Sequence, residues 1–231
     1  MKIYNIGIAV IVTALILTGC SQNYKNKNVE IQEKVVTKPA ETGDELLFKF
    51  TPGKYHNHPT FAIWIEDMAG NYRHPVYVTK SVSNGIWGHG LLEPGKWKDE
   101  PGKGVRPAAL PYWFYQRGDG TMPAIPDSEY KLPDAVTSAT PAAGFYLQTR
   151  SGMEKGEKYR ILLEINQTWD WNDYWYNNKY PDDPDYKTSC QPALVYAVTI
   201  DPNSDLTEYY FNPIGHSHHS GKNGNLYTDL S

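Results

Sequence analysis

Proline and glycine recur along the whole chain and interrupt almost every apolar stretch. The sequence has 17 prolines and 19 glycines, together with 18 tyrosines. Proline and glycine disfavour helix interiors, whereas aromatic side chains suit the pleated surface of a β-sheet. We therefore expect an all-β protein that is built from short strands.

Seven short apolar runs follow one another from Glu45 onward, separated by turn-forming residues. They are Leu46–Phe50, Phe61–Glu66, Val76–Val82, Gly144–Gln148, Tyr159–Asn166, Ala193–Ile200 and Leu206–Phe211. The turn residues of 67–71 and 201–205 predict two hairpins, and Arg106–Trp113 predicts one short helix with proline near its first turn. Because the apolar face of each sheet needs a partner, we expect an immunoglobulin-like, two-sheet antiparallel sandwich with long loops.

The N-terminus has the pattern of a bacterial lipoprotein export signal. Lys2 precedes the apolar run Ile6–Leu17, and Leu17-Thr18-Gly19-Cys20 closes it. A helix over this run would cover about 18 Å, which is short of the roughly 30 Å of a bilayer core. We expect a signal peptide over 1–19, a lipidated Cys20 with a flexible tether over 20–44, and a sandwich domain over 45–231. The protein is then a membrane-anchored lipoprotein outside the cytoplasm, at the outer membrane or the periplasmic face.

Composition and motifs exclude several function classes. The net charge is −4 and no basic cluster is present, so nucleic acid is not expected as a partner. With Cys20 lipidated, Cys190 is the remaining cysteine, so no intrachain disulfide forms and the thiol is expected to be buried. No motif of a nucleophile elbow, zinc protease, phosphate loop or dinucleotide site is found. We therefore expect a non-catalytic protein.

The segment 169–178 interleaves aromatic rings with Asn and Asp. Rings that stack on sugars, next to polar hydrogen-bonding groups, are typical of glycan sites. Trp169, Trp171 and Trp175 are the candidate platform. Alternatively, this long aromatic loop folds back and covers the end of the sandwich.

Three histidines occur within four residues near the C-terminus. His216, His218 and His219 are candidate ligands of a divalent metal such as zinc or copper, because alternate residues of an extended chain point to one side. The alternative is that this Gly-rich tract is an ordinary exposed loop.

The segment 134–141 resembles the acceptor motif that flavin transferases recognise in secreted redox proteins. Asp134, Thr137, Ala139 and Thr140 fit that motif, and Ser138 replaces its usual glycine. By this resemblance Thr140 is the candidate for covalent attachment of FMN. The alternative is a Ser/Thr-rich turn before the next strand.

Several ordered motifs together resemble an uncharacterised bacterial family, the secreted domain of unknown function 2271. They are Ala62–Asp67 with Gly70, Arg106-Pro107-x-Ala109-Leu110-Pro111-x-Trp113, Asp134–Pro141, Glu164–Gln167 and Gln191–Tyr196. Proteins of this family are often encoded near flavin transferases and PepSY proteins, and its pattern continues past Ser231. The resemblance implies an accessory role in a flavin-linked redox system, with a flavin transferase and membrane redox proteins as partners. A glycan-binding module and a metal-binding lipoprotein remain the alternatives.

Overall fold

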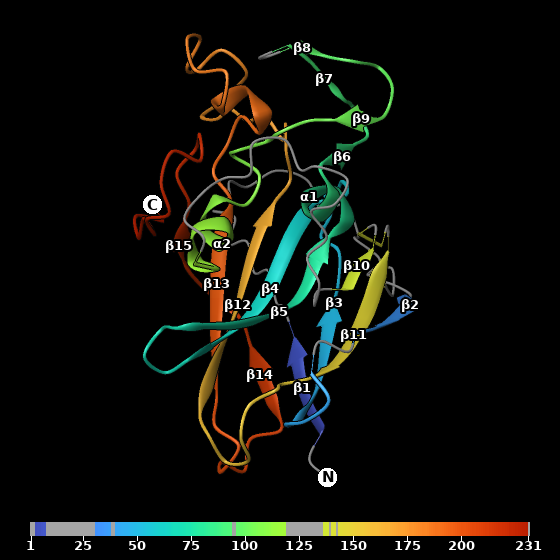
Figure 1. Ribbon diagram of the computed structural model, residues 1–231, viewed down its shortest axis with the longest axis vertical. Coiled ribbons are helices and arrows are strands. Elements are labelled where there is room, and N and C mark those ends of the chain that lie inside the picture. The colour runs from blue at the N-terminus through green and yellow to red at the C-terminus, as the bar shows by residue number, and fades with distance from the viewer. Residues whose placement is uncertain are drawn as a thin grey trace, which may run out of the picture.

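The computed structural model describes residues 3–7, 31–37, 40–93, 96–118, 136–138, 140–141 and 143–230. These residues form two packed β-sheets, two short α-helices and long connections at one end (Figure 1). The all-β sandwich expected from the sequence is confirmed.

The first sheet has the strand order β14-β1-β3-β11-β2. Its strands are β14 (Glu208–Tyr210), β1 (Ile3–Gly7), β3 (Glu45–Phe50), β11 (Gly144–Arg150) and β2 (Ile31–Val36). β3 and β11 pair antiparallel, whereas β1 runs parallel to both of its neighbours and β2 runs parallel to β11.

The second sheet has the order β10-β5-β4-β12-β13-β15. Its strands are β10 (Val136–Ser138), β5 (Tyr72–Thr79), β4 (Thr60–Asp67), β12 (Tyr159–Asn166), β13 (Leu194–Ile200) and β15 (Asn212–His216). Apart from the parallel pair β10–β5, every pairing in this sheet is antiparallel. The predicted hairpin through 67–71 is confirmed, because it joins β4 to β5.

Both faces of the second sheet are covered, which is why β4 is buried almost throughout. One face packs on the first sheet through a core that includes Phe48, Ile63 and Leu147. The other face carries Trp64 and Leu162 and lies under α2 (Pro111–Gln116). Pro111 stands at the first turn of this helix, where a missing N–H costs nothing. The short helix expected in this region is therefore present, and it starts at Pro111.

Three differences from the sequence-based expectation are found. The predicted hairpin through 201–205 is wrong, because β14 pairs with β1 in the opposite sheet and β13 pairs with β12 and β15. The chain crosses between sheets here, which buries Tyr209 and Phe211 in the central core. The end of the run Val76–Val82 is not strand, since α1 (Lys80–Asn84) begins after β5.

The third difference concerns the N-terminus. Residues 31–36 of the expected flexible tether form β2, and the buried Val35 attaches it to the central core. β1 lies within the expected signal peptide and is the strand partner of β14 in the described part of the chain. Cys20 lies outside the described residues, so the lipidation site stays a prediction. Among the described residues, no helix is long and apolar enough to cross a membrane.

Candidate functional site

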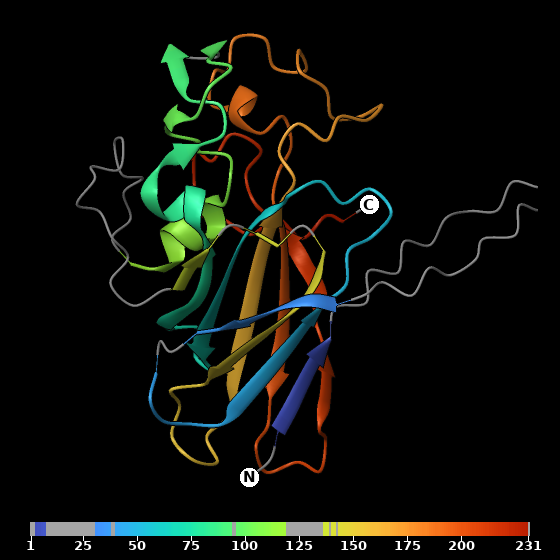
Figure 2. The same cartoon turned by 90° about the vertical axis from the view of Figure 1, so that its right-hand side faces the viewer.

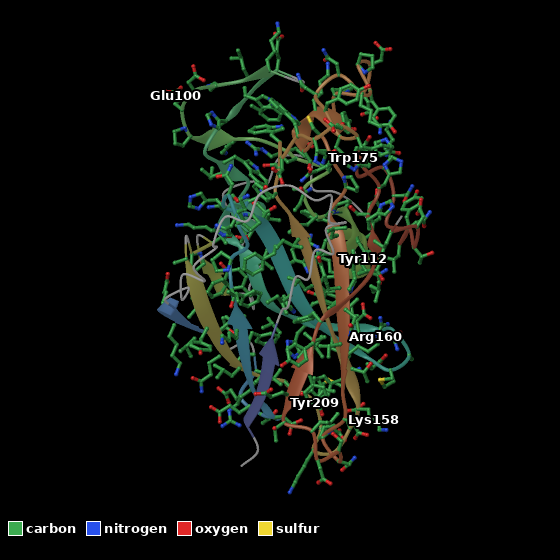
Figure 3. The ribbon with its side chains drawn as sticks, turned by 180° about the vertical axis from the view of Figure 1, so that it is seen from behind. Glu100, Tyr112, Lys158, Arg160, Trp175 and Tyr209 are labelled. Carbon is green, nitrogen blue, oxygen red and sulfur yellow. The ribbon has the colours of Figure 1, made fainter. Side chains whose placement is uncertain are left out.

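One end of the sandwich carries long connections, among them the aromatic segment 169–178 (Figure 2). Residues 167–185, here called the aromatic loop, leave β12 and lead to a 3₁₀ turn at Tyr186–Thr188. Beside this loop lie two small sheets, formed by β6 (Ile86–Trp87) with β9 (Gly102–Lys103) and by β7 (Leu91–Glu93) with β8 (Lys96–Trp97). In the view from behind, Trp175 marks this end, and Lys158 and Tyr209 mark the opposite end (Figure 3).

The three candidate tryptophans of the aromatic loop have different environments. Trp169 is half-buried, and its indole N–H donates to the Lys187 carbonyl at 2.9 Å. Trp175 is also half-buried, with ring contacts to Tyr174 and Tyr186. Trp171 alone of the three is exposed, at 58%. A platform of all three indoles is therefore not what the structure presents.

Two tyrosines extend the exposed aromatic surface around Trp171. Tyr174 is 65% exposed and Tyr176 is 48% exposed. Both lie within the segment 169–178, in which only the tryptophans were predicted as a platform. The tip of the loop thus offers three ring faces to solvent within six residues of chain.

Local hydrogen bonds fix the tip of the aromatic loop. The side-chain oxygen of Asn172 accepts the backbone N–H groups of Tyr174 and Trp175, at 2.9 and 2.8 Å. The ammonium of Lys179 donates to the Tyr174 carbonyl at 2.9 Å and lies over the Tyr174 ring. The Cys190 thiol donates to the side-chain oxygen of Asn177 at 3.6 Å. A surface with these constraints loses less conformational entropy on binding than a mobile one.

Tyr186 anchors the aromatic loop from below. Its side chain is fully buried, and its hydroxyl lies 2.8 Å from the carbonyl oxygens of both Tyr176 and Cys190. Its ring meets the Tyr180 ring edge-on at 4.9 Å between centroids. Cys190, a buried free thiol as expected, has a positive φ of 64° in the turn that follows.

A buried cation beside the aromatic loop was not predicted from the sequence. Three indole rings surround the guanidinium of Arg106, which is 7% exposed. They belong to Trp87, Trp97 and Trp169, with ring centroids 4.3, 5.0 and 4.7 Å from Cζ. We call this group the Arg106 cage. Tryptophan at three scattered positions gives no periodic signal, so only the fold reveals that these rings converge.

The polar contacts of Arg106 are few. One guanidinium nitrogen donates to the His89 carbonyl at 3.1 Å, while Nε is buried without a hydrogen-bond partner among the described residues. Within the described ranges no acidic side chain forms an ion pair with it. Burial lowers the pKa of Arg106 to about 10, so the group is a cation at neutral pH.

The three candidate metal ligands are held in ring stacks. His216 stacks on Tyr227 and contacts Asp229 through Nε2, at 3.3 Å. His218 stacks on His219 with 4.4 Å between centroids, and its Nδ1 accepts the Ser220 N–H. In the part of the chain that the structure describes, no group of three His, Cys, Asp or Glu side chains is placed to hold a metal ion. The geometry gives the metal site no support, and it remains a prediction.

His219 lies between two rings, and its titration is expected to lower the stability of the protein in acid. It stacks on Tyr180 at 4.3 Å and on His218, and burial followed by repulsion from His218 lowers its pKa from 6.5 to about 4. Between these values the unfolded chain takes up a proton that the folded protein does not, so stability falls as pH drops from 6.5 to 4. Because the ring is partly exposed, we expect the free energy of unfolding to fall by about 1 kcal/mol.

Denaturation at pH 7 and pH 4.5 measures this difference in stability. His219→Phe should reduce the dependence, whereas Tyr180→Phe should retain it; equal slopes in all three proteins would contradict the assignment.

The flavin acceptor motif lies at an edge of the second sheet. Thr137 and Ser138 belong to β10, which pairs with β5, and Asp134 and Ala139 lie outside the described residues. Thr140 follows the strand and is half-buried. Its hydroxyl donates to the Pro59 carbonyl at 2.8 Å and lies 3.1 Å from the Thr79 hydroxyl.

The most strongly perturbed carboxyl group lies under α2. Glu164 on β12 is fully buried and accepts the backbone N–H groups of Tyr112 and Trp113, at 3.1 and 2.7 Å. It thus replaces the capping side chain that Leu110 lacks at the helix N-terminus. Burial raises the pKa of Glu164 to about 8. Because Glu164 is sealed from solvent beneath the helix, its arrangement fits a structural role.

Comparisons with protein-family models, with curated proteins and with solved structures give no match for this chain. The resemblance to the domain of unknown function 2271 therefore stays a prediction.

Proposed function

We propose that this protein is a non-catalytic binding protein that captures glycans through the exposed tip of the aromatic loop. The observation that carries the proposal is the set of solvent-facing rings of Trp171, Tyr174 and Tyr176. Sugar rings present apolar C–H faces that stack on such aromatic surfaces, and the intervening amides supply hydrogen bonds. The expected lipid anchor would hold this surface outside the cytoplasm, where glycans occur.

Binding of oligosaccharides tests this function. We expect a panel of oligosaccharides to quench tryptophan fluorescence for at least one sugar class. The double variant Trp171→Ala with Tyr174→Ala should weaken binding at least about tenfold, since each stacked ring contributes on the order of 1 kcal/mol. Tyr210→Ala, on the distant strand β14 and also exposed, is the matched control. A panel without any response, or equal binding by the double variant, would reject the function.

A second candidate is the accessory role in flavin-linked electron transfer, with FMN on Thr140. Its support is the position of Thr140, which is partly accessible beside the edge strand β10. Attachment would replace the hydrogen bond to the Pro59 carbonyl, at a cost of about 1 kcal/mol. Coexpression with a flavin transferase should add the mass of one FMN. Thr140→Ala should remove this increment and Thr207→Ala, at an exposed position, should retain it. An unmodified intact mass in the unsubstituted protein would reject this candidate.

A further inference from the structure

The Arg106 cage contains a cation whose charge the described part of the protein does not neutralise. The side chain is 7% exposed, its Nε has no hydrogen-bond partner in the described ranges, and its ring neighbours are uncharged. Stacking on indole faces offsets part of the desolvation of a guanidinium. It leaves the in-plane N–H groups without the anionic acceptor that they bind most strongly. An incoming oxyanion would supply that acceptor.

The cage is also continuous with the aromatic loop. Trp169 forms one wall of the cage and is two residues from the exposed Trp171, so their Cα atoms lie within about 7 Å. Trp97, the wall contributed by β8, contacts the Trp169 ring at 5.6 Å between centroids. Both Trp97 and Trp169 are only half-buried, so the cage reaches the surface at this point. An oligosaccharide stacked on the exposed rings would thus lie next to the walls of the cage.

We propose that the aromatic end of the sandwich selects glycans that carry a carboxylate, and that Arg106 is the residue that recognises this group. This inference rests on the proposed glycan-binding function and adds the class of sugar, the uronates. The planar guanidinium presents paired N–H donors that match the two oxygens of a carboxylate. The indoles hold the guanidinium plane in place and exclude water from the ion pair, which strengthens the interaction.

Titration with an oligogalacturonate and with its methyl ester tests the proposal, because esterification removes the negative charge and adds only a methyl group to each sugar unit. Tryptophan fluorescence reports on the cage directly, since three indoles touch Arg106. We expect the acid to bind about tenfold more tightly than the ester, and the difference to shrink at high salt. Arg106→Met, which keeps the apolar stem, should bring the acid down to the affinity of the ester. Arg150→Met, at an exposed arginine, should leave the preference unchanged.

A measurement on the unsubstituted protein covers the case in which Arg106→Met does not fold. The Nε–H signal of Arg106 in a nitrogen–proton NMR spectrum should shift on adding the acid and remain unmoved on adding the ester. Equal affinity for acid and ester, with both lost in the Trp171 and Tyr174 variant, would overturn the role of Arg106 and leave glycan binding intact. Failure of the acid to bind would also overturn it, and the wider sugar panel then decides separately whether the protein binds glycans.

Discussion

Replacing Glu164 by alanine is expected to lower the free energy of unfolding by about 3 kcal/mol, because two buried N–H groups lose their acceptor. These N–H groups belong to Tyr112 and Trp113 at the start of α2, where no local side chain can cap them. The change also leaves a cavity between the helix and β12, which adds to the loss. Urea denaturation followed by circular dichroism at pH 7 measures the effect.

The titration of Glu164 is expected to make stability depend on pH in the direction opposite to that of His219. The pKa of Glu164 is about 8 in the folded protein, against an ordinary value of 4.5. Between these values the folded protein keeps a proton that the unfolded chain releases, so stability falls as pH rises, by at most about 1.4 kcal/mol per pH unit. Glu164→Gln removes this titration and should flatten the profile from pH 5 to 8. An unchanged profile in Glu164→Gln, or a loss below 0.5 kcal/mol in Glu164→Ala, would show that the helix N-terminus does not depend on this residue.

Much of the sandwich follows from local sequence patterns. The runs that became β3, β4, β11, β12 and β13 are bounded by turn residues, and the hairpin joining β4 to β5 needs only local chemistry. The crossing from β13 to β14 was missed because its turn at 201–205 resembles a hairpin turn. The chain crosses to the other sheet because Tyr209 and Phe211 are buried between the sheets, and this burial depends on the whole fold. The strands β1, β2 and β10 were missed because they pair parallel with distant segments.

The candidate site was only partly visible in the sequence for a similar reason. The aromatic loop stands out as a local concentration of rings, and its position at the end of the sandwich agrees with the covering role considered as an alternative. Which rings face solvent depends on contacts that are distant in sequence, such as that of Trp169 with Arg106. Likewise, the close spacing of His216, His218 and His219 suggested shared coordination, but Tyr180 and Tyr227 draw the rings into stacks. The residue types in the sequence therefore indicated where the aromatic and histidine segments lie, but not which side chains they contact.

Replacing Tyr186 by alanine is expected to detach the aromatic loop and to lower the free energy of unfolding by about 4 kcal/mol. The ring is fully buried, and its hydroxyl lies within hydrogen-bonding distance of the carbonyl oxygens of Tyr176 in the loop and of Cys190 beyond it. Loss of the ring also removes the surface against which Tyr180 and Trp175 pack. Cleavage by chymotrypsin within 167–185 should accelerate by a factor of ten or more, because local opening becomes easier by more than about 1.4 kcal/mol.

Two further variants separate the ring of Tyr186 from its hydroxyl. Tyr186→Phe keeps the packing and should cost about 1 to 2 kcal/mol, since the two carbonyl groups lose a shared donor. Tyr176→Ala removes an exposed ring from the same loop and should change stability by less than about 0.5 kcal/mol, while it weakens glycan binding. If Tyr186→Ala were cleaved no faster than the unsubstituted protein, the loop would be held by its own turns. The positions of Trp171 and Tyr174 would then not depend on packing against Tyr186.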